Sequence, residues 1–216
     1  MAVLEGIVRR LVKAGAGNNS MMAGYDDLGQ LRVSTSKPEY YELSRARRLF
    51  GVSSATGTAI APVTAVPTTA AAWALFNGED PGGKAYVVLG AFAWLVSGTA
   101  GLGASLLGSV SIAPVAGTKP TAYANSIMSS LSGGPTSPKA IFAQGLTLVG
   151  TPAWVHLAGR DVPAAIEVGA SITADAKVML VIPPQYSGNL TILSPAGTTP
   201  LWGAGFIWAE VEADLE

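Results

Sequence analysis

The amino-acid sequence predicts an all-β protein, a jelly-roll-like β-sandwich with a partly helical N-terminal arm. The 216 residues include 26 glycines and 14 prolines, which is typical of short strands joined by tight turns and unlike a helical bundle. Apolar runs of strand length recur at intervals of about 8–12 residues, and about eight of them favour the two Greek keys of a jelly roll. We expect an arm with two short helices and an extended linker at residues 1–67, and the sandwich at residues 68–216.

The charge content predicts a protein that contacts other molecules over much of its surface. Only 12% of the residues are charged, which is too few to cover a monomer with solvated groups. Residues 1–50 contain eight Lys and Arg against five Asp and Glu, whereas residues 51–216 contain five against nine. A basic arm on an acidic body suits an arm that reaches a neighbouring subunit.

The arm begins with a predicted amphipathic helix that ends near Gly15. Its apolar residues recur at helical spacing and form one stripe: Val3, Leu4, Ile7, Val8, Leu11 and Val12. Charged residues interrupt the apolar run, so we do not expect a signal peptide. Docking on a protein partner is the preferred interpretation of the stripe, ahead of packing on the core or binding a membrane surface.

A second helix is predicted from Ser36 to Phe50. Ser36 and Glu39 have the spacing of a capping box, and Gly51 would end the helix. Three arginines would complement the helix dipole and are expected to contact a partner: Arg45, Arg47 and Arg48. Nucleic acid is not expected as that partner, because no aromatic platform or wider basic face accompanies them. Residues 52–69 are expected to form a linker or an extended edge segment.

The central stretch of the body is residues 70–96, where two apolar runs flank the turn residues Asn77 to Gly83. We expect a β-hairpin here. The second run is apolar on both faces, as suits a strand between the core and a subunit contact. One face is assigned to the partner contact through four residues: Tyr86, Val88, Phe92 and Trp94.

Further strands are expected at residues 105–112, 141–149, 154–157, 164–168, 177–182, 189–193 and 202–215. The last of these strands would place four acids on one face: Glu210, Glu212, Asp214 and Glu216. This acidic face is expected to meet solvent or a basic partner. The basic arm is the candidate partner, within one subunit or between two.

No residue pattern indicates catalysis, a cofactor or a metal site. Cysteine is absent, and a lone His156 in an apolar strand is typical of a structural residue, because zinc needs three or four ligands. A Ser-His-Asp triad with Asp161 or Asp175 would lack the usual G-x-S-x-G turn. Glu79 and Asp80 lie outside any calcium-binding loop pattern. We therefore expect a protein that is not an enzyme.

A membrane span is the competing interpretation of residues 85–107, which are long and apolar enough to cross a bilayer. Several Gly, Ser and Thr residues fall inside this stretch, the apolar pattern alternates as in a strand, and no basic cluster flanks it. We do not expect membrane insertion.

Residues 25–34, YDDLGQLRVS, combine an acidic turn with Gly-x-Leu-Arg-Val-Ser in an arm ahead of a Gly- and Ala-rich β domain. This arrangement resembles virion structural proteins of tailed phages. The resemblance implies a capsid-decorating or capsid-building subunit that forms a symmetric homo-oligomer, of which a trimer is one form. It also implies contacts with other virion proteins, assembly in the host cytoplasm and a place in the virion. The alternative is a receptor- or carbohydrate-binding module of a phage tail, acting through loops at residues 78–83 and 133–137.

Overall fold

The structure is a computed structural model that describes residues 22–25, 31–34, 41–54, 56–99, 103–112, 129–130, 137, 139–160, 170–175, 180–194 and 199–212. The chain divides into two compact units, Met1–Tyr41 and Glu42–Glu216. In the first unit, β1 (Met22–Tyr25) pairs antiparallel with β2 (Leu31–Ser34). The predicted helix of residues 3–12 lies outside the described residues.

A short helix, α2 (Tyr41–Arg45), precedes the sandwich. The prediction of a helix that continues to Phe50 is wrong, because the chain leaves the helical conformation after Arg45. Leu49 and Phe50 fit the helical spacing of the apolar residues, but they belong to a strand in which Phe50 enters the core and Leu49 lies half-buried on the other face.

The helix ends in a Schellman motif rather than at the expected glycine. The N–H of Arg47 donates to the carbonyl of Ser44 at 3.0 Å, and the N–H of Arg48 donates to the carbonyl of Leu43 at 2.9 Å. Arg47 takes the left-handed position of the motif, with φ at 56°. Glycine is the usual residue there because it has no Cβ to clash with the backbone.

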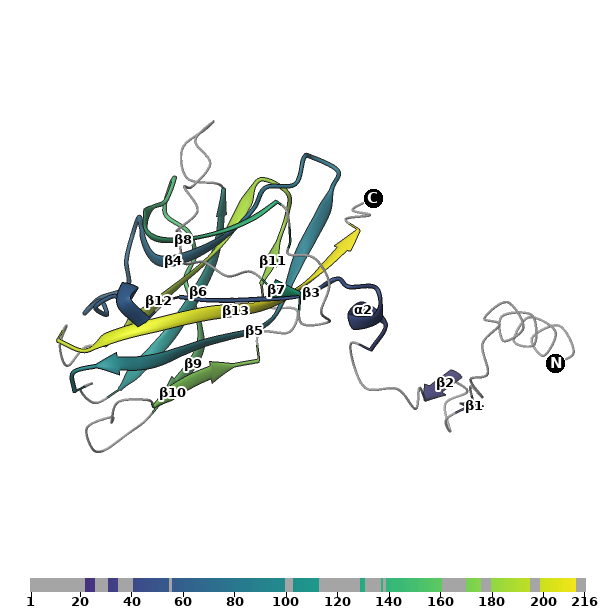
Figure 1. Cartoon of the computed structure of the whole chain (residues 1–216), viewed down its shortest axis with the longest axis horizontal. Helices are drawn as coiled ribbons and strands as arrows, with labels where there is room; N and C mark the ends of the chain where they lie inside the picture. The colour runs from purple at the N-terminus through teal and green to yellow at the C-terminus, as the bar shows by residue number, and fades with distance from the viewer. Residues whose placement is uncertain are drawn as a thin grey trace, which may run out of the picture. The chain divides into compact units, whose positions relative to one another are not determined.

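The second unit is an all-β sandwich in which eight strands pair as nested antiparallel couples (Figure 1). The strands are β3 (Leu49–Ser53), β4 (Ala70–Asn77), β5 (Lys84–Ser97), β6 (Ala104–Ile112), β9 (Val155–Arg160), β10 (Ser171–Ala174), β12 (Tyr186–Leu193) and β13 (Leu201–Glu212). Strand β6 pairs with β9, β5 with β10, β4 with β12 and β3 with β13. A long hairpin rolled into two sheets gives this nesting, which is the jelly-roll arrangement.

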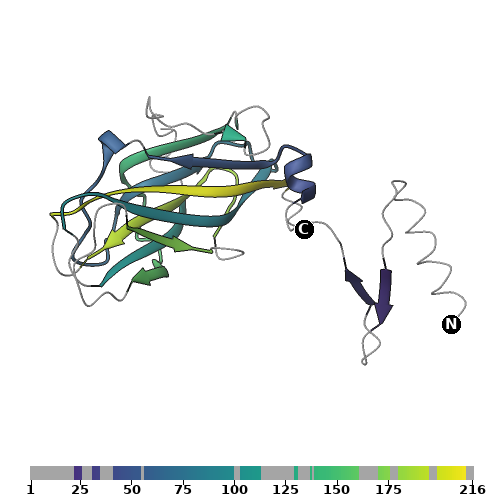
Figure 2. The same ribbon diagram turned by 60° about the horizontal axis from the view of Figure 1, so that its bottom comes forward.

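The four strand pairs lie in two sheets, two pairs in each, and Figure 2 shows the sandwich from a second direction. The β5 sheet has the order β10-β5-β13-β3-β7, with β11 (Val181–Ile182) also paired to β5. The β4 sheet has the order β8-β4-β12-β6-β9. Two additional strands, β7 (Ser129–Ser130) and β8 (Ala140–Thr147), lie at the edges of these sheets, and a 3₁₀ turn occupies Thr56–Thr58. The predicted all-β sandwich is confirmed.

The hairpin predicted for residues 70–96 is wrong, although both of its strands exist. Strands β4 and β5 lie in different sheets, so the turn at residues 78–83 carries the chain from one sheet to the other. The Asn77 amide holds this crossing by donating to the carbonyls of Lys84 and Ile182 at 2.8 and 3.0 Å. Turn residues predict that the chain reverses, but they do not say which sheet receives the next strand.

The sandwich begins before residue 68, because β3 pairs with β13 and buries Phe50 and Val52 in the core. The segment between β3 and β4 is extended and attached to both sheets. Two bridges make the attachment: Ile60 to Trp202 and Val63 to Leu193. Of the two expectations for residues 52–69, the extended segment describes the structure better than a free linker.

A β-bulge in β5 decides which of its side chains face the core. The pairing with β13 passes from Gly90–Ile207 to Val88–Trp208, so Leu89 is an extra residue without an opposite partner. Tyr86 and Val88 face the core on one side of the bulge, and Ala91, Ala93 and Leu95 face it on the other.

Aromatic rings from both sheets fill the core. Phe50 and Tyr86 pack on Trp208 with ring centroids 5.8 and 6.0 Å away, and Phe142 meets Phe206 edge to face at 6.2 Å. These contacts join β3, β5, β8 and β13, which lie in two sheets.

Within the predicted span, residues 85–97 belong to β5 and residues 104–107 to β6, so the described part is not one helix. Within the described ranges, the structure contains no helix with the length and apolar character needed to cross a membrane.

We predict that Arg47→Gly raises the free energy of unfolding by about 0.5–1 kcal/mol, because glycine relieves the left-handed backbone strain. Urea unfolding followed by circular dichroism measures the change. Arg47→Ala is the matched control, since it removes the side chain but keeps the Cβ, and it should gain nothing. Equal stability of the two variants would contradict the prediction.

Candidate interaction surface

On the face of the β5 sheet that points away from the core, the described outward positions within the strands are uncharged, and the exposed Asp175 follows directly after β10. Strand register sorts this face into two parts. The aliphatic half consists of residues in adjacent register on β11, β5, β13 and β3: Val181, Val87, Ala209, Leu49 and the neighbouring Ile207. The aromatic half lies beyond the bulge and consists of Phe92, Trp94, Gly203, Gly205, Ser53, Ser171 and Thr173.

The aromatic half is built on two glycines of β13. A Cβ added at Gly203 would overlap the Trp94 ring, and one added at Gly205 would overlap the Phe92 ring. The two side chains therefore extend sideways over β13 and do not project straight out from the sheet. Their centroids are 6.0 Å apart, their planes differ by 26°, and both side chains are half-buried.

The opposite outer face, on the β4 sheet, is of another kind. It carries the large apolar residues Phe76, Leu107 and Ile141 beside a group of buried polar side chains that bond to one another across β12 and β6. The Asn189 amide donates to the hydroxyls of Ser109 and Ser111 at 3.2 and 2.9 Å, and its carbonyl oxygen accepts from Ser187 at 3.1 Å. The polar groups of this face are thus satisfied within the chain.

Two of the residues assigned to partner contact cannot serve that role. Tyr86 and Val88 are fully buried in the core, because the bulge at Leu89 reverses the alternation between them and Phe92. Burial raises the pKa of Tyr86, and the charge of Glu210 raises it further. The other two assigned residues, Phe92 and Trp94, lie on the outer face, and their contact with a partner stays a prediction.

Sequence reasoning missed the glycines beneath these rings. The run Trp202-Gly203-Ala204-Gly205-Phe206 alternates apolar residues that enter the core with glycines that face outward. A strand with only glycine on one face leaves its backbone uncovered there, so side chains of a neighbouring strand can pack over it. This alternation in residues 202–206 could have predicted an outer face on which aromatic rings pack over glycine.

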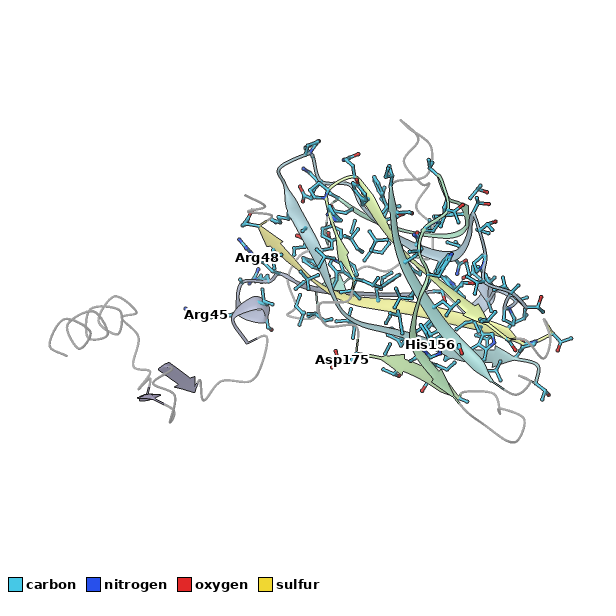
Figure 3. The ribbon with its side chains drawn as sticks, turned by 180° about the vertical axis from the view of Figure 1, so that it is seen from behind. Arg45, Arg48, His156 and Asp175 are labelled. Atoms are coloured by element: carbon cyan, nitrogen blue, oxygen red, sulfur yellow. The ribbon has the colours of Figure 1, made fainter. Side chains whose placement is uncertain are left out.

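The three arginines assigned to partner contact lie around the end of α2, where Figure 3 labels two of them. Arg45 and Arg47 are exposed, whereas Arg48 forms an ion pair with Glu212 at 3.0 Å between Nη2 and Oε1. We expected the acidic last strand to pair with the basic arm, residues 1–67. For Glu212 this pairing occurs, and it occurs within one chain.

Of the two expectations for the acidic face, a basic partner rather than solvent describes Glu210, although that partner is Lys84 and not a residue of the arm. Glu210 is almost fully buried, accepts a hydrogen bond from the Ser137 hydroxyl, and lies 3.3 Å from Lys84 Nζ. A buried carboxylate needs such partners, and here they come from the start of β5 and the segment before β8.

The residues considered for chemistry form contacts of ordinary structural kinds. His156 is exposed on β9, with Nε2 3.1 Å from the Ser105 hydroxyl across the β6–β9 pair (Figure 3). Lys139 binds Glu79 and Asp80 at 2.9 and 3.1 Å, and these carboxylates raise the pKa of Lys139. Among the described residues, no three His, Cys, Asp or Glu side chains are grouped so that they could hold a metal ion. Asp161 and residues 133–136 lie outside the described ranges.

Comparisons of the chain with protein-family models, with curated proteins and with solved structures give no match. The function therefore has to be inferred from the chain's own fold and surface.

We predict that Gly203→Ala and Gly205→Ala each lower the free energy of unfolding by about 1–3 kcal/mol, because the new Cβ must displace an aromatic ring. Gly205→Ala should cost more, since its Cβ would also meet the Val52 carbonyl. Gly57→Ala is the control, because no atom lies within 4 Å of its added Cβ. Urea unfolding of the three variants checks the order, and equal effects would contradict it.

Proposed function

We propose that this chain is a non-enzymatic structural protein of a tailed-phage virion that decorates or builds the capsid as a symmetric homo-oligomer. The observation that carries the proposal is the aliphatic half of the outer face. Strand β5 contributes to the core on one side and presents Val87 to this uncharged apolar surface on the other.

The chemistry of the aliphatic half suits contact with a second copy. Val181 is 41% exposed, and Val87, Leu49 and Ile207 are half-buried beside it. Two such faces can meet without like-charge repulsion, and their association removes apolar area from water. A closed ring or a two-fold pair would satisfy the face in every subunit.

The arm supplies the second contact in this proposal. The apolar stripe of residues 3–12 and the exposed Arg45 and Arg47 would dock on a neighbouring subunit or another virion protein. The phage setting rests on the resemblance of residues 25–34, of which Leu31–Ser34 form β2. Placement in the virion after assembly in the host cytoplasm is part of the same proposal.

The alternative function is a receptor- or carbohydrate-binding module of a phage tail. The aromatic half of the outer face favours it, because flat rings beside hydroxyl groups are a surface that small polar ligands can use.

We predict that the full chain forms a stable oligomer at micromolar concentration and that Val181→Asp lowers its mass toward that of the monomer. The new carboxylate would have to be buried unpaired in each contact. Analytical ultracentrifugation or mass photometry measures the change. Val66→Asp is the matched control, because Val66 is 55% exposed and does not belong to the outer face. A stable monomer of the unmodified chain would overturn the proposed function.

A further inference from the structure

We propose that the aromatic half of the outer face is a binding site for a neutral carbohydrate, with pyranose rings stacked on Phe92 and Trp94. This site goes beyond the proposed function, and it uses a part of the face that the aliphatic contact does not require.

The first argument is the orientation of the rings. Trp94 and Phe92 extend over Gly203 and Gly205 of the neighbouring strand, and their ring planes lie within 26° of each other. The face of an aromatic ring carries the negative part of its quadrupole and attracts the weakly positive C–H groups of a ligand. The two rings are near-parallel with centroids 6.0 Å apart, so together they offer an aromatic platform on which a sugar ring can pack.

The second argument is the kind of polar group beside the platform. Strand register places Ser171 next to Trp94, and it places Thr173 next to Phe92. On the far side, Ser53 pairs with Gly205, and all three hydroxyl-bearing residues are exposed. A hydroxyl both donates and accepts hydrogen bonds, so this rim matches a ligand that is itself rich in hydroxyl groups.

The third argument is charge. The described residues of the aromatic half include no Lys or Arg, and the exposed Asp175 just after β10 is itself acidic, so the site offers nothing to neutralise a phosphate or a carboxylate. Binding of nucleic acid depends on Lys and Arg contacts with the phosphates, which this surface lacks. A flat ligand with apolar C–H faces, hydroxyl groups at its rim and no charge is a neutral sugar ring.

The experiment begins with the full chain. It is electrophoresed through native gels that contain hydroxyethylcellulose, xylan, dextran or galactomannan, and it is applied to an array of neutral and acidic glycans. We expect retardation in at least one neutral polysaccharide and no preference for acidic glycans. Affinity for the matching oligosaccharide is then measured by tryptophan fluorescence. Trp73, Trp202 and Trp208 are fully buried, whereas Trp94 and Trp154 are partly exposed, so loss of the signal in Trp94→Phe assigns it to Trp94.

Variants locate the site. Trp94→Ala and Phe92→Ala should each weaken binding by about tenfold, which corresponds to the loss of one stacking contact. Trp94→Phe keeps a ring and should retain most of the affinity. The exposed pair Ser171→Ala with Thr173→Ala should weaken binding by about threefold to tenfold without an effect on folding. Val66→Asp, which lies away from the outer face, is the control and should bind the sugar as the unmodified chain does.

Three outcomes would overturn this inference. The first is no binding to any of the neutral polysaccharides or arrayed neutral glycans. The second is glycan binding that Trp94→Ala leaves unchanged. The third is a change of oligomeric mass in Trp94→Ala without glycan binding, which would show that a second copy covers the rings. A monomeric chain that binds sugar through Trp94 would leave this inference intact and would overturn the proposed structural function instead.

Discussion

The pairing of β5 with β13 is the interaction on which the rest of the sandwich depends. It runs from Lys84–Glu212 to Ser97–Leu201 and contains the bulge at Leu89. Because a strand alternates its side chains between two faces, one extra residue moves every later side chain to the opposite face. The bulge therefore places Tyr86 with the core rings and Phe92 on the surface, although both occupy even-numbered positions of one strand. Core and interaction surface are fixed by the same register.

The class of fold could be predicted from the sequence because its signals are local. Apolar alternation and turn residues lie within single strands, and they correctly indicated β5, β6, β8, β12 and β13. The assignment of strands to sheets depends on contacts far apart in the chain, so the turn after Asn77 was interpreted as a hairpin instead of a crossing. Strand β3 was missed because Leu49 and Phe50 also fit a helical repeat. The burial of Phe50 against Trp208 outweighs that local preference.

The candidate surface could be predicted only in part, for a related physical reason. Two apolar faces on β5 indicated a second contact, and Phe92 and Trp94 lie there. The bulge at Leu89 leaves no mark in the apolar pattern, so Tyr86 and Val88 were placed on the wrong side. The outward-facing glycines of β13 could be recognised in the run of residues 202–206. Which side chains cover them depends on the neighbouring strand, and the sequence does not identify that strand. The distinction between an aliphatic and an aromatic half therefore required the three-dimensional pairing.

The position of β13 between β5 and β3 has a consequence for the order of events during synthesis. The couple formed by β3 and β13 joins residues about 150 positions apart, and it closes the roll. Until residues 201–212 have left the ribosome, β5 and β3 have no common neighbour, and neither half of the outer face exists. A nascent chain consequently cannot associate through this face with other copies being translated nearby. An oligomer of the proposed kind would therefore form only from complete subunits.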